Sequence, residues 1–482
     1  MGESLKEFGG DVGCETDLFP VIYTMSNDLK GVYLMAVPEN WKTKHLILLV
    51  GGNPLPNYVA GKILLQDGGK LHLIHSTDTR KIAEHIGNQF GKENSKWYAH
   101  PCNDPASRDD IESALYSVLQ ECGSESVGLN YTGGTKAMSV HAYSAIKSKV
   151  AVATYLDSRT LTLRRMDDQA TERIADVQFA VEPTLDNLMD LHNISVQKGR
   201  IRNETIHDEF NKGMGASYAN PETANLYEIW CQRYLRNFKN IQGPARDDLD
   251  KAINAANAQE TDERKIAQLG MDVRAIMVSH DTELVEKSSR LPVNPVPLSE
   301  YPALVDVNNA LRKLIGIAET DETLDLSGYT NKELRSLIRH MDGDWVENLT
   351  MQALQQIASK CRLREILMTI DTDARPGQYN FEFDVVAMRG YQLYAFSCTR
   401  SADNGLCKTK LFEASIRATQ LGGSEARVAL VCAHPAPNKL KAQVKKWWYT
   451  EDPQFEVFGA PDLGNLPEKF KEWFDSNKKV NQ

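Results

Sequence analysis

The residues best suited to do chemistry in this chain are the ten from Asn130 to Ser139, which read NYTGGTKAMS. Gly133 and Gly134 allow backbone conformations that a side chain would forbid. Helical spacing begins at Ala137, so unpaired N–H groups and the positive end of a helix dipole would face this turn. Its polar side chains are those of Asn130, Thr132, Thr135 and Lys136. The pattern predicts a phosphate-binding turn, and a plain glycine-rich strand-to-helix turn is the alternative.

Two familiar phosphate motifs do not fit this turn. A P-loop needs four residues between its glycines and a Ser or Thr after its lysine, whereas Lys136 is followed by Ala137. No GxGxxG pattern follows the first apolar run at residues 44–52 either. A Rossmann enzyme that uses a nucleotide cofactor is therefore a weak alternative.

A second set of chemically competent residues lies near the C-terminus. Asp384 stands inside the apolar run FEFDVVAMRG, and a carboxylate in such a strand is costly unless it is paired or liganded. Glu382 is a second acid near the same element, so burying both would need a cation. A salt bridge from Asp384 to Arg389 or Arg417 is the structural alternative to a metal site.

Metal-dependent cleavage of a phosphodiester needs carboxylates that hold Mg²⁺ or Mn²⁺ and a cation that stabilises the developing charge. Glu347 lies on an expected amphipathic helix, DWVENLTMQALQQIAS, which precedes the Asp384 strand. Lys408 and Lys410 open the helix that follows it. The candidate metal ligands are thus Glu347 and Asp384.

Residues 44 to about 165 must position the first site, because they alternate strands and helices in the rhythm of a parallel, doubly wound sheet. Ligands of such sheets bind beyond the carboxyl ends of the strands. Three polar loops are expected to converge at this edge. The predicted ligand-binding residues are Gly52, Asn53, Asn57, Ser76, Thr77, Asn130, Thr132, Gly133, Gly134, Thr135 and Lys136.

The rest of the chain divides into three further parts. Residues 1–43 have weak patterning and are interpreted as an N-terminal extension, and residues 44–184 are the Rossmann-like unit. Residues 185–339 turn helical and polar, with LYEIWCQRYLRNF, DDLDKAINAANAQ and the proline-punctuated LPVNPVPLSEYP, and are interpreted as a helical connector or insertion. Residues 340–482 form a second α/β unit in the order helix, hairpin, helix, strand.

Composition limits the class of protein. A length of 482 residues suggests two or three domains, and 41% hydrophobic and 25% charged residues are ordinary values for a soluble protein. No run approaches a membrane span, and the net charge of −10 confines any polyanion site to a local groove. A cytoplasmic location with reduced thiols is expected for the eight scattered cysteines, Cys14, Cys102, Cys122, Cys231, Cys361, Cys398, Cys407 and Cys432.

The C-terminal unit resembles the PD-(D/E)XK nuclease superfamily, whose core follows this order of elements with an Asp on the first hairpin strand and Glu-x-Lys on the second. Here the second strand reads Ser397-Cys398-Thr399, so the usual glutamate and lysine are missing. In this superfamily the lysine can migrate to the adjacent helix. The resemblance implies that the missing charges are replaced from the segment CKTKLFEA, with Lys410 as first choice beside Lys408 and Glu413.

The chain as a whole resembles the CRISPR ancillary nucleases, in which a CARF domain (CRISPR-associated Rossmann fold) is fused to a PD-(D/E)XK domain. The turn at Asn130–Lys136 and the loop GGNPLPN at residues 51–57 carry the resemblance in the first unit. It implies a homodimer that senses a cyclic oligoadenylate, with cyclic tetra-adenylate expected, and then cleaves DNA, with RNA as a second substrate. No membrane partner is expected.

Two questions stay open at the level of sequence. The Ser397-Cys398-Thr399 departure keeps alive a second hypothesis, a cyclic-oligoadenylate-sensing regulator whose nuclease domain is inactive. The segment KLKAQVKKWWYT (439–450) sets four lysines beside Trp447 and Trp448, which suits phosphates and stacked bases. A solvated helix with its tryptophans tucked into the core is the favoured interpretation of that segment.

Overall fold

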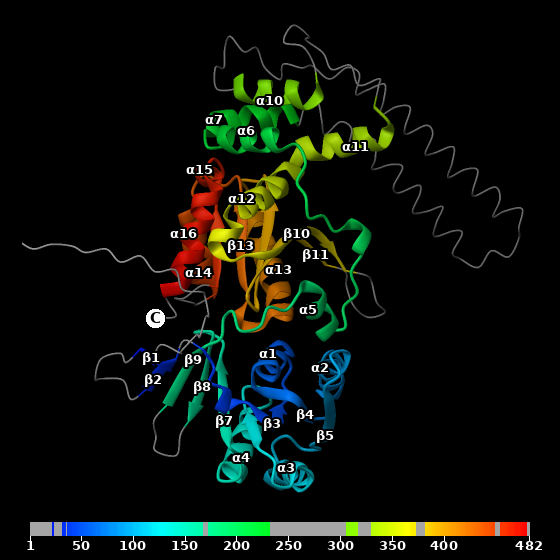
Figure 1. The fold of residues 1–482 in the computed structure, drawn as a ribbon. Coiled ribbons are helices and arrows are strands. Elements are labelled where there is room, and N and C mark those ends of the chain that lie inside the picture. The colour runs from blue at the N-terminus through cyan, green and yellow to red at the C-terminus, as the bar shows by residue number, and fades with distance from the viewer. Residues whose placement is uncertain are drawn as a thin grey trace, which may run out of the picture.

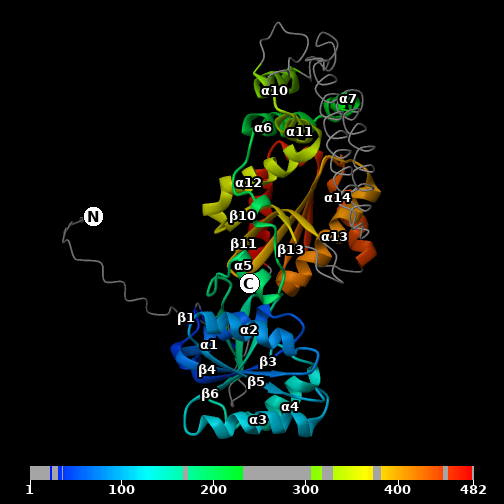
Figure 2. The same ribbon diagram turned by 90° about the vertical axis from the view of Figure 1, so that its right-hand side faces the viewer.

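Two α/β units and a helical part follow one another along the molecule (Figure 1). The computed structural model describes residues 22–23, 31–34, 36–166, 172–231, 305–316, 329–372, 381–448 and 454–479. The N-terminal unit lies at one end, the C-terminal unit in the middle and a group of helices at the other end, and the perpendicular view in Figure 2 shows the same sequence of layers.

The N-terminal unit is built on a nine-stranded sheet in the order β1-β2-β9-β8-β7-β6-β3-β4-β5. Its central strands β7, β6, β3, β4 and β5 are all parallel, whereas β8 joins β7 and β9 in antiparallel fashion. The strands are β1 (Ile22–Tyr23), β2 (Gly31–Leu34), β3 (Thr43–Leu49), β4 (Leu65–His75), β5 (Lys96–Pro101), β6 (Val127–Asn130), β7 (Val152–Asp157), β8 (Thr162–Met166) and β9 (Glu172–Asp176).

Helices cover both faces of the parallel part, because the strand side chains alternate between two apolar cores. Leu46 and Leu48 face the core under α1 (Leu55–Leu64) and α2 (Arg80–Lys92), whereas Ile47 and Leu49 face α3 (Arg108–Cys122) and α4 (Lys136–Ile146). The expected α/β fold with a parallel, Rossmann-like sheet is confirmed.

The sheet is larger than the sequence pattern indicated. The strand β5, whose residues Lys96–Pro101 alternate little in hydrophobicity, and the antiparallel strands β8 and β9 are not predicted by the sequence pattern. The segment interpreted as an N-terminal extension contributes β2, which pairs in parallel with β9. Backbone pairing in a sheet needs no strong apolar pattern, and this is why these strands were not predicted.

The C-terminal unit has a five-stranded sheet in the order β10-β11-β12-β13-β14. The first three strands are antiparallel to one another, and β12, β13 and β14 are parallel. One face packs on α12 (Trp345–Cys361) and α16 (Leu466–Lys479), the other on α13 (Asn404–Gly422) and α14 (Pro437–Trp448). The strands are β10 (Arg364–Asp371), β11 (Glu382–Arg389), β12 (Gln392–Thr399), β13 (Arg427–Cys432) and β14 (Phe455–Phe458), with a short α15 (Ala460–Leu463).

Local signals explain where α13 begins and ends. The side chain of Asp403 accepts a hydrogen bond from the backbone N–H of Leu406, which satisfies one of the free donors at the start of the helix. Gly423, with φ +66°, ends it in a conformation that favours glycine, and a 3₁₀ turn (Gly423–Glu425) leads into β13. The hairpin turn between β11 and β12 uses Gly390 at φ +57° in the same way.

A connecting segment joins the two units and continues into the helical part. It contains helix α5 (Leu185–Leu191) and the short 3₁₀ helix η2 (Lys198–Arg200). Val196 forms an isolated bridge with Thr372, directly after β10, and Arg202 forms one with Met368 of β10. The described helices beyond are α6 (Asp208–Tyr218), α7 (Pro221–Trp230), α10 (Val305–Ile315) and α11 (Asn331–Arg339), which continues through a π-helical turn (His340–Asp344) into α12.

Several expected elements of the connector cannot be compared with the fold. The segments at residues 247–259 and 291–302 lie outside the described residues, as do residues 232–238 of the first expected helix. Residues Pro221–Trp230 do form helix α7. Within the described ranges, none of the helices has the length and apolar character needed to cross a membrane.

Candidate functional site

The three expected loops do meet at one edge of the N-terminal sheet, because β3 lies between β4 and β6. The loop after β3 and the turn after β6 are in contact through glycines. A Cβ atom on Gly51 would lie 3.0 Å from the backbone nitrogen of Gly134, and one on Gly133 would overlap the carbonyl oxygen of Leu49. Gly134 also has φ +74°. The glycine pair is therefore needed for close approach of the two loops.

Several of the predicted ligand-binding side chains are engaged in building these loops. Asn57 is fully buried and donates to the carbonyl of Leu49. Asn130 donates to the hydroxyl of Thr154, and the hydroxyl of Thr132 accepts from the N–H of Leu156 at 2.7 Å. The backbone N–H of Ser76 donates to the hydroxyl of Thr79, and the two hydroxyls are hydrogen-bonded to each other. These residues shape the edge, and their side chains are not directed at solvent.

The exposed groups at this edge lie at the start of α4. Thr135 is the N-cap of the helix and accepts from the N–H of Met138, while its own hydroxyl donates to the carbonyl of Pro105. Lys136 follows in the first turn with an exposed side chain, and Gly52 and Thr77 are exposed on the neighbouring loops. An anion placed here would meet the helix N-terminus and an ammonium group.

Asn53, predicted as a ligand-binding residue, contacts the C-terminal unit. Its Oδ1 atom accepts from the N–H of Leu55, and its amide nitrogen Nδ2 lies against the α-carbon of Gly423 so closely that a Cβ there would overlap it. Glu425 is packed at the same place, with Oε2 2.7 Å from that Cβ position. The loop after β3 thus reaches directly from the ligand edge to the end of α13.

Glu425 is itself unusual. It is buried to 1% exposure, and burial raises the pKa of its carboxyl to about 7 in spite of hydrogen bonds from its own backbone and from Ser424. A carboxyl that titrates near neutrality therefore lies at the contact between the two units.

In the C-terminal unit, Asp384 is held on β11 by three donors. One carboxylate oxygen accepts from the N–H of Cys398 at 2.6 Å and from the hydroxyl of Ser397 at 3.2 Å, and it lies 3.6 Å from the ammonium nitrogen of Lys410. Burial alone would lower the pKa of Lys410, but the charge of Asp384 raises it. The two residues form a half-buried ion pair at 36% and 13% side-chain exposure.

The structure separates the two candidate lysines. Lys408 points away from Asp384 and stacks its ammonium group over the ring of Trp447, 4.5 Å from the centroid. Glu413 is exposed on α13 and takes no part in the contacts that hold Asp384 among the described residues. Only Lys410 of the three replacement candidates is thus placed beside Asp384.

Two further carboxyls surround the Asp384–Lys410 pair. Glu347, half-buried on α12, has a pKa well above its usual value, because of burial first and the charge of Asp384 second. The pKa of Glu382 is raised by burial, by Asp371 opposite it on β10 and by Asp384. Such mutual repulsion is relieved by a bound cation, so the donor set fits Mg²⁺ or Mn²⁺.

The salt-bridge interpretation of Asp384 named the wrong partners. Arg389 is buried and donates to the backbone carbonyls of Cys361 and Phe474, and Arg417 contacts the ring of Phe381. A strand alternates its faces, so Arg389, five residues from Asp384, points to the opposite side of the sheet.

The lysine- and tryptophan-rich segment forms helix α14, and one expectation about it is wrong. Trp447 is 66% exposed, although it was expected in the core, whereas Trp448 packs against Phe455. Lys441 pairs with Glu456 at 2.6 Å. Exposed Trp447 and the Lys408 ammonium above it form a cationic aromatic surface on the side of α13 that faces α14; Tyr449 and Thr450 lie outside the described residues.

One residue that the sequence analysis passed over lies beside the site. Arg400 directly follows β12, and its buried guanidinium pairs with Asp342 at 2.6 Å and with Glu228 of α7. It lines a pocket of about 530 Å³ with Tyr218 and Ser401, between the helical part and the end of the sheet. Its position directly after Ser397-Cys398-Thr399 was the one feature of the sequence that could have marked Arg400 as a candidate.

No protein-family model and no curated protein matches this sequence. Solved structures do match its fold. Protein VC1899 from Vibrio cholerae is 14% identical, covers 90% of this chain with 98% of its own length and superposes with a TM-score of 0.55. Can2 from Sulfobacillus thermosulfidooxidans, solved in complex with cyclic tetra-adenylate, is 13% identical, covers 89% of this chain with 99% of its own and has a TM-score of 0.58. The arrangement of both α/β units is therefore shared, over nearly the whole chain, with these two proteins.

Proposed function

We propose that this protein is a metal-dependent nuclease activated by a cyclic oligoadenylate, an ancillary effector of type III CRISPR defence. The observation that carries the proposal is the meeting of Lys410 and Asp384, 3.6 Å apart, at the place where Glu347 also projects from α12. A half-buried lysine beside several carboxyls with raised pKa values is an arrangement that is concentrated at functional sites. The shared fold with Can2, a protein that binds cyclic tetra-adenylate, supports the sensing part.

The residues of the nuclease site have separable roles in this proposal. Asp384 and Glu347 would hold Mg²⁺ or Mn²⁺, which when bound would supply an activated water and polarise the phosphoryl oxygens. The N–H of Cys398 and the hydroxyl of Ser397 fix the orientation of the Asp384 carboxylate. Lys410 places a positive charge next to the scissile phosphate and stabilises the charge that develops there.

The ligand edge of the N-terminal unit supplies the switch. In a homodimer, two copies of Lys136 and of the α4 N-terminus would approach one cyclic oligoadenylate from opposite sides. A ligand that changes the loop after β3 would move Asn53 against Gly423, at the end of the helix that carries Lys410. Activation then requires that the ligand prefer one arrangement of this contact.

The cationic aromatic surface on α13 and α14 is proposed to contact the substrate backbone and its bases. Trp447 is exposed beside the ammonium group of Lys408, a combination that suits a single strand or a locally opened duplex. DNA is the first candidate substrate and RNA the second.

A regulator with an inactive nuclease domain is the second candidate. It is favoured by the sequence Ser397-Cys398-Thr399, which stands where the superfamily pattern has an acid and a lysine. In place of those charges, the hydroxyl of Ser397 and the N–H of Cys398 donate hydrogen bonds to one oxygen of Asp384. In that case the sensing unit would act through binding alone.

The two candidates are separated by one experiment. Purified protein is incubated with supercoiled plasmid and with single-stranded DNA and RNA, with Mg²⁺ or Mn²⁺, in the presence and absence of cyclic tetra-adenylate. Ligand-dependent cleavage that Asp384→Asn abolishes, while ligand affinity stays unchanged, supports the nuclease. Ligand binding with no cleavage of any substrate supports the regulator.

A further inference from the structure

Three histidines form a row across three neighbouring strands of the N-terminal sheet. His45 lies on β3, His72 on β4 and His100 on β5. The ring nitrogens are 2.9 Å apart between His45 Nδ1 and His72 Nε2, and 3.0 Å apart between His72 Nδ1 and His100 Nε2. All three side chains are buried, on the face of the sheet that α3 covers. Neither the sensing nor the cleavage site uses them.

The row ends at a carboxylate. His45 Nε2 lies 2.6 Å from the carboxylate of Glu125, in the turn that follows α3. Burial, with the neighbouring imidazoles of His100 and His45, lowers the pKa of His72 to about 3, so its ring is neutral at physiological pH. Neutral imidazole is the form that binds transition metals. In a row of hydrogen-bonded neutral imidazoles, each ring uses one nitrogen as a donor and the other as an acceptor.

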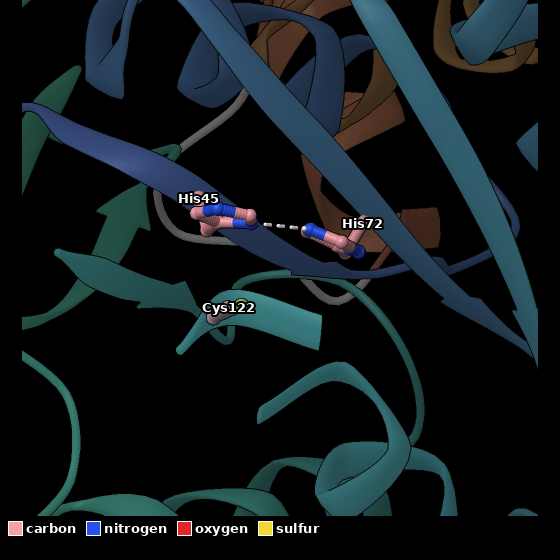
Figure 3. A group of neighbouring side chains, drawn as sticks. All are labelled: His45, His72 and Cys122. Carbon is pink, nitrogen blue, oxygen red and sulfur yellow. Dashed lines mark hydrogen bonds between the residues drawn. The ribbon is translucent and has the colours of Figure 1, made fainter. Parts of the chain in front are cut away.

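A thiol completes the cluster. Cys122 is the last residue of α3 and is 3% exposed. Its sulfur and one ring nitrogen each of His45 and His72 all lie within 4.8 Å of one another, and Figure 3 shows the two rings facing each other with Cys122 below them. Burial and the charge of Glu121 raise the pKa of this thiol to about 11. His72, His100 and Glu121 form a second group that overlaps the first.

We propose that this cluster is a zinc site in which His45 Nδ1, His72 Nε2 and the Cys122 thiolate bind the ion. Tetrahedral zinc with bonds of about 2.0 Å to nitrogen separates two nitrogens by about 3.3 Å, so the two rings need to part by roughly 0.4 Å. On binding, the thiol releases its proton to solvent, the proton of His72 moves from Nε2 to Nδ1, and the proton of His100 moves from Nε2 to Nδ1. A water molecule would take the fourth position.

The neighbours of the cluster suit these tautomers. With His45 bound through Nδ1, its Nε2–H donates to the Glu125 carboxylate, the arrangement that commonly orients a zinc-bound histidine. With His72 bound through Nε2, its Nδ1–H donates to His100 Nε2. Both ligands would thus keep the outer hydrogen bonds that they already have. Two protons relocate within the row, one on His72 and one on His100, and the Nδ1–H of His100 becomes a new donor.

The donor set selects the metal. Two imidazoles and a thiolate are borderline or soft ligands, which favour Zn²⁺ over Mg²⁺ or Mn²⁺. The cluster is therefore chemically distinct from the carboxylates of Glu347 and Asp384. The ion would tie the end of α3 to β3 and β4, a structural role in the sensing unit.

The test uses the full-length protein stripped with a chelator and then titrated with Zn²⁺ and with Co²⁺ as a spectroscopic probe. We expect one zinc per chain and, with Co²⁺, tetrahedral absorption bands together with a thiolate-to-metal charge-transfer band. Cys122→Ser should remove that band and weaken zinc binding by more than about 100-fold, and Glu125→Gln should weaken it by about 10- to 100-fold. Cys102→Ser is the matched control, because Cys102 is also buried in this unit and its thiol also donates to a backbone carbonyl, that of Asp104, as the Cys122 thiol does to Val118, but Cys102 lies outside the cluster.

Two results would overturn the proposal. One is stripped wild-type protein that takes up no zinc and gives no thiolate band with Co²⁺. The other is a zinc ion that remains bound with unchanged affinity in both Cys122→Ser and His72→Gln. If Cys122→Ser fails to fold, the wild-type cobalt spectrum and His72→Gln still decide the question. Glu347→Gln, which alters the carboxylate site, should leave the zinc content unchanged.

Discussion

Replacement of Lys410 by methionine keeps the length of the side chain and removes its charge, so it isolates the electrostatic contribution of this residue to cleavage. The ammonium nitrogen lies 3.6 Å from an oxygen of Asp384. Two unit charges at about this distance interact by roughly 4 kcal/mol at an effective dielectric constant of 20. Lys410 is 36% exposed, so solvent screening reduces the figure to about 2 kcal/mol.

The same charge acts on the phosphate in the transition state, so the expected loss in the cleavage rate is about 30-fold. The assay is single-turnover cleavage at saturating cyclic tetra-adenylate and Mn²⁺, with ligand affinity measured alongside to show that the sensing unit is intact. Lys408→Met is the matched control, since Lys408 is two residues away on the same helix but contacts Trp447. It should change substrate affinity more than the rate of the chemical step.

A Lys410→Met variant that cleaves within about threefold of the wild-type rate would refute the electrostatic role, because screening cannot remove the whole interaction at this burial. An equal loss of cleavage rate in Lys408→Met and Lys410→Met would show that both lysines act only through the overall positive charge of the helix. Lys410→Arg, which keeps the charge, should retain most of the rate.

Three other predictions concern the sensing edge and its contact with the C-terminal unit. Lys136→Ala should weaken binding of cyclic tetra-adenylate by about 10- to 100-fold in calorimetry, because a charge-assisted contact to phosphate is lost. Glu425→Gln should stabilise the protein above pH 7 and have little effect at pH 4.5. The folded-state pKa of about 7 exceeds the usual 4.5, so the wild type loses up to about 3 kcal/mol as pH rises through this window, and thermal denaturation across the pH range would detect it. Gly423→Ala should cost about 2 kcal/mol of stability, because φ is +66° and the new Cβ would overlap the amide of Asn53; in an Asn53→Ala background the cost should fall to about 1 kcal/mol.

Each of these predictions has a result that contradicts it. Unchanged ligand affinity in Lys136→Ala, compared with Lys147→Ala at the other end of α4, would place the phosphate elsewhere. If the melting temperatures of wild type and Glu425→Gln changed with pH in the same way, ionisation of Glu425 would not destabilise the folded protein. A Gly423→Ala penalty that is the same with and without Asn53 would show that the contact between the units contributes nothing to it.

The sequence alone was sufficient to predict the type of fold and the meeting of three polar loops at one edge of the sheet. Long apolar runs such as KHLILLV and RVALVCA can only be buried strands, and the carboxyl ends of parallel strands must share an edge. The glycine pair at Gly133-Gly134 was interpretable because its cause is local: two loops approach each other too closely for a Cβ atom. The edge strand β5 and the interior strands β8 and β9 were missed because their apolar patterns are weak and strand pairing is settled only in the folded sheet.

Tertiary structure decided which side chains work together. Lys408 and Lys410 are two residues apart and indistinguishable by pattern, yet the rotation of α13 over the sheet brings only Lys410 to Asp384. The contact between Asn53 and Gly423 joins residues about 370 positions apart, which no local rule can foresee.

The histidine row makes the same point. His45, His72 and His100 are scattered through the sequence at spacings that match no metal motif, and only the order of β3, β4 and β5 in the sheet sets their rings side by side above Cys122. Sequence determines what is local: backbone freedom, hydrophobic period and the ends of helices. The partners of a charged or metal-binding side chain depend on how strands are ordered and helices rotated, and these are properties of the whole packed chain.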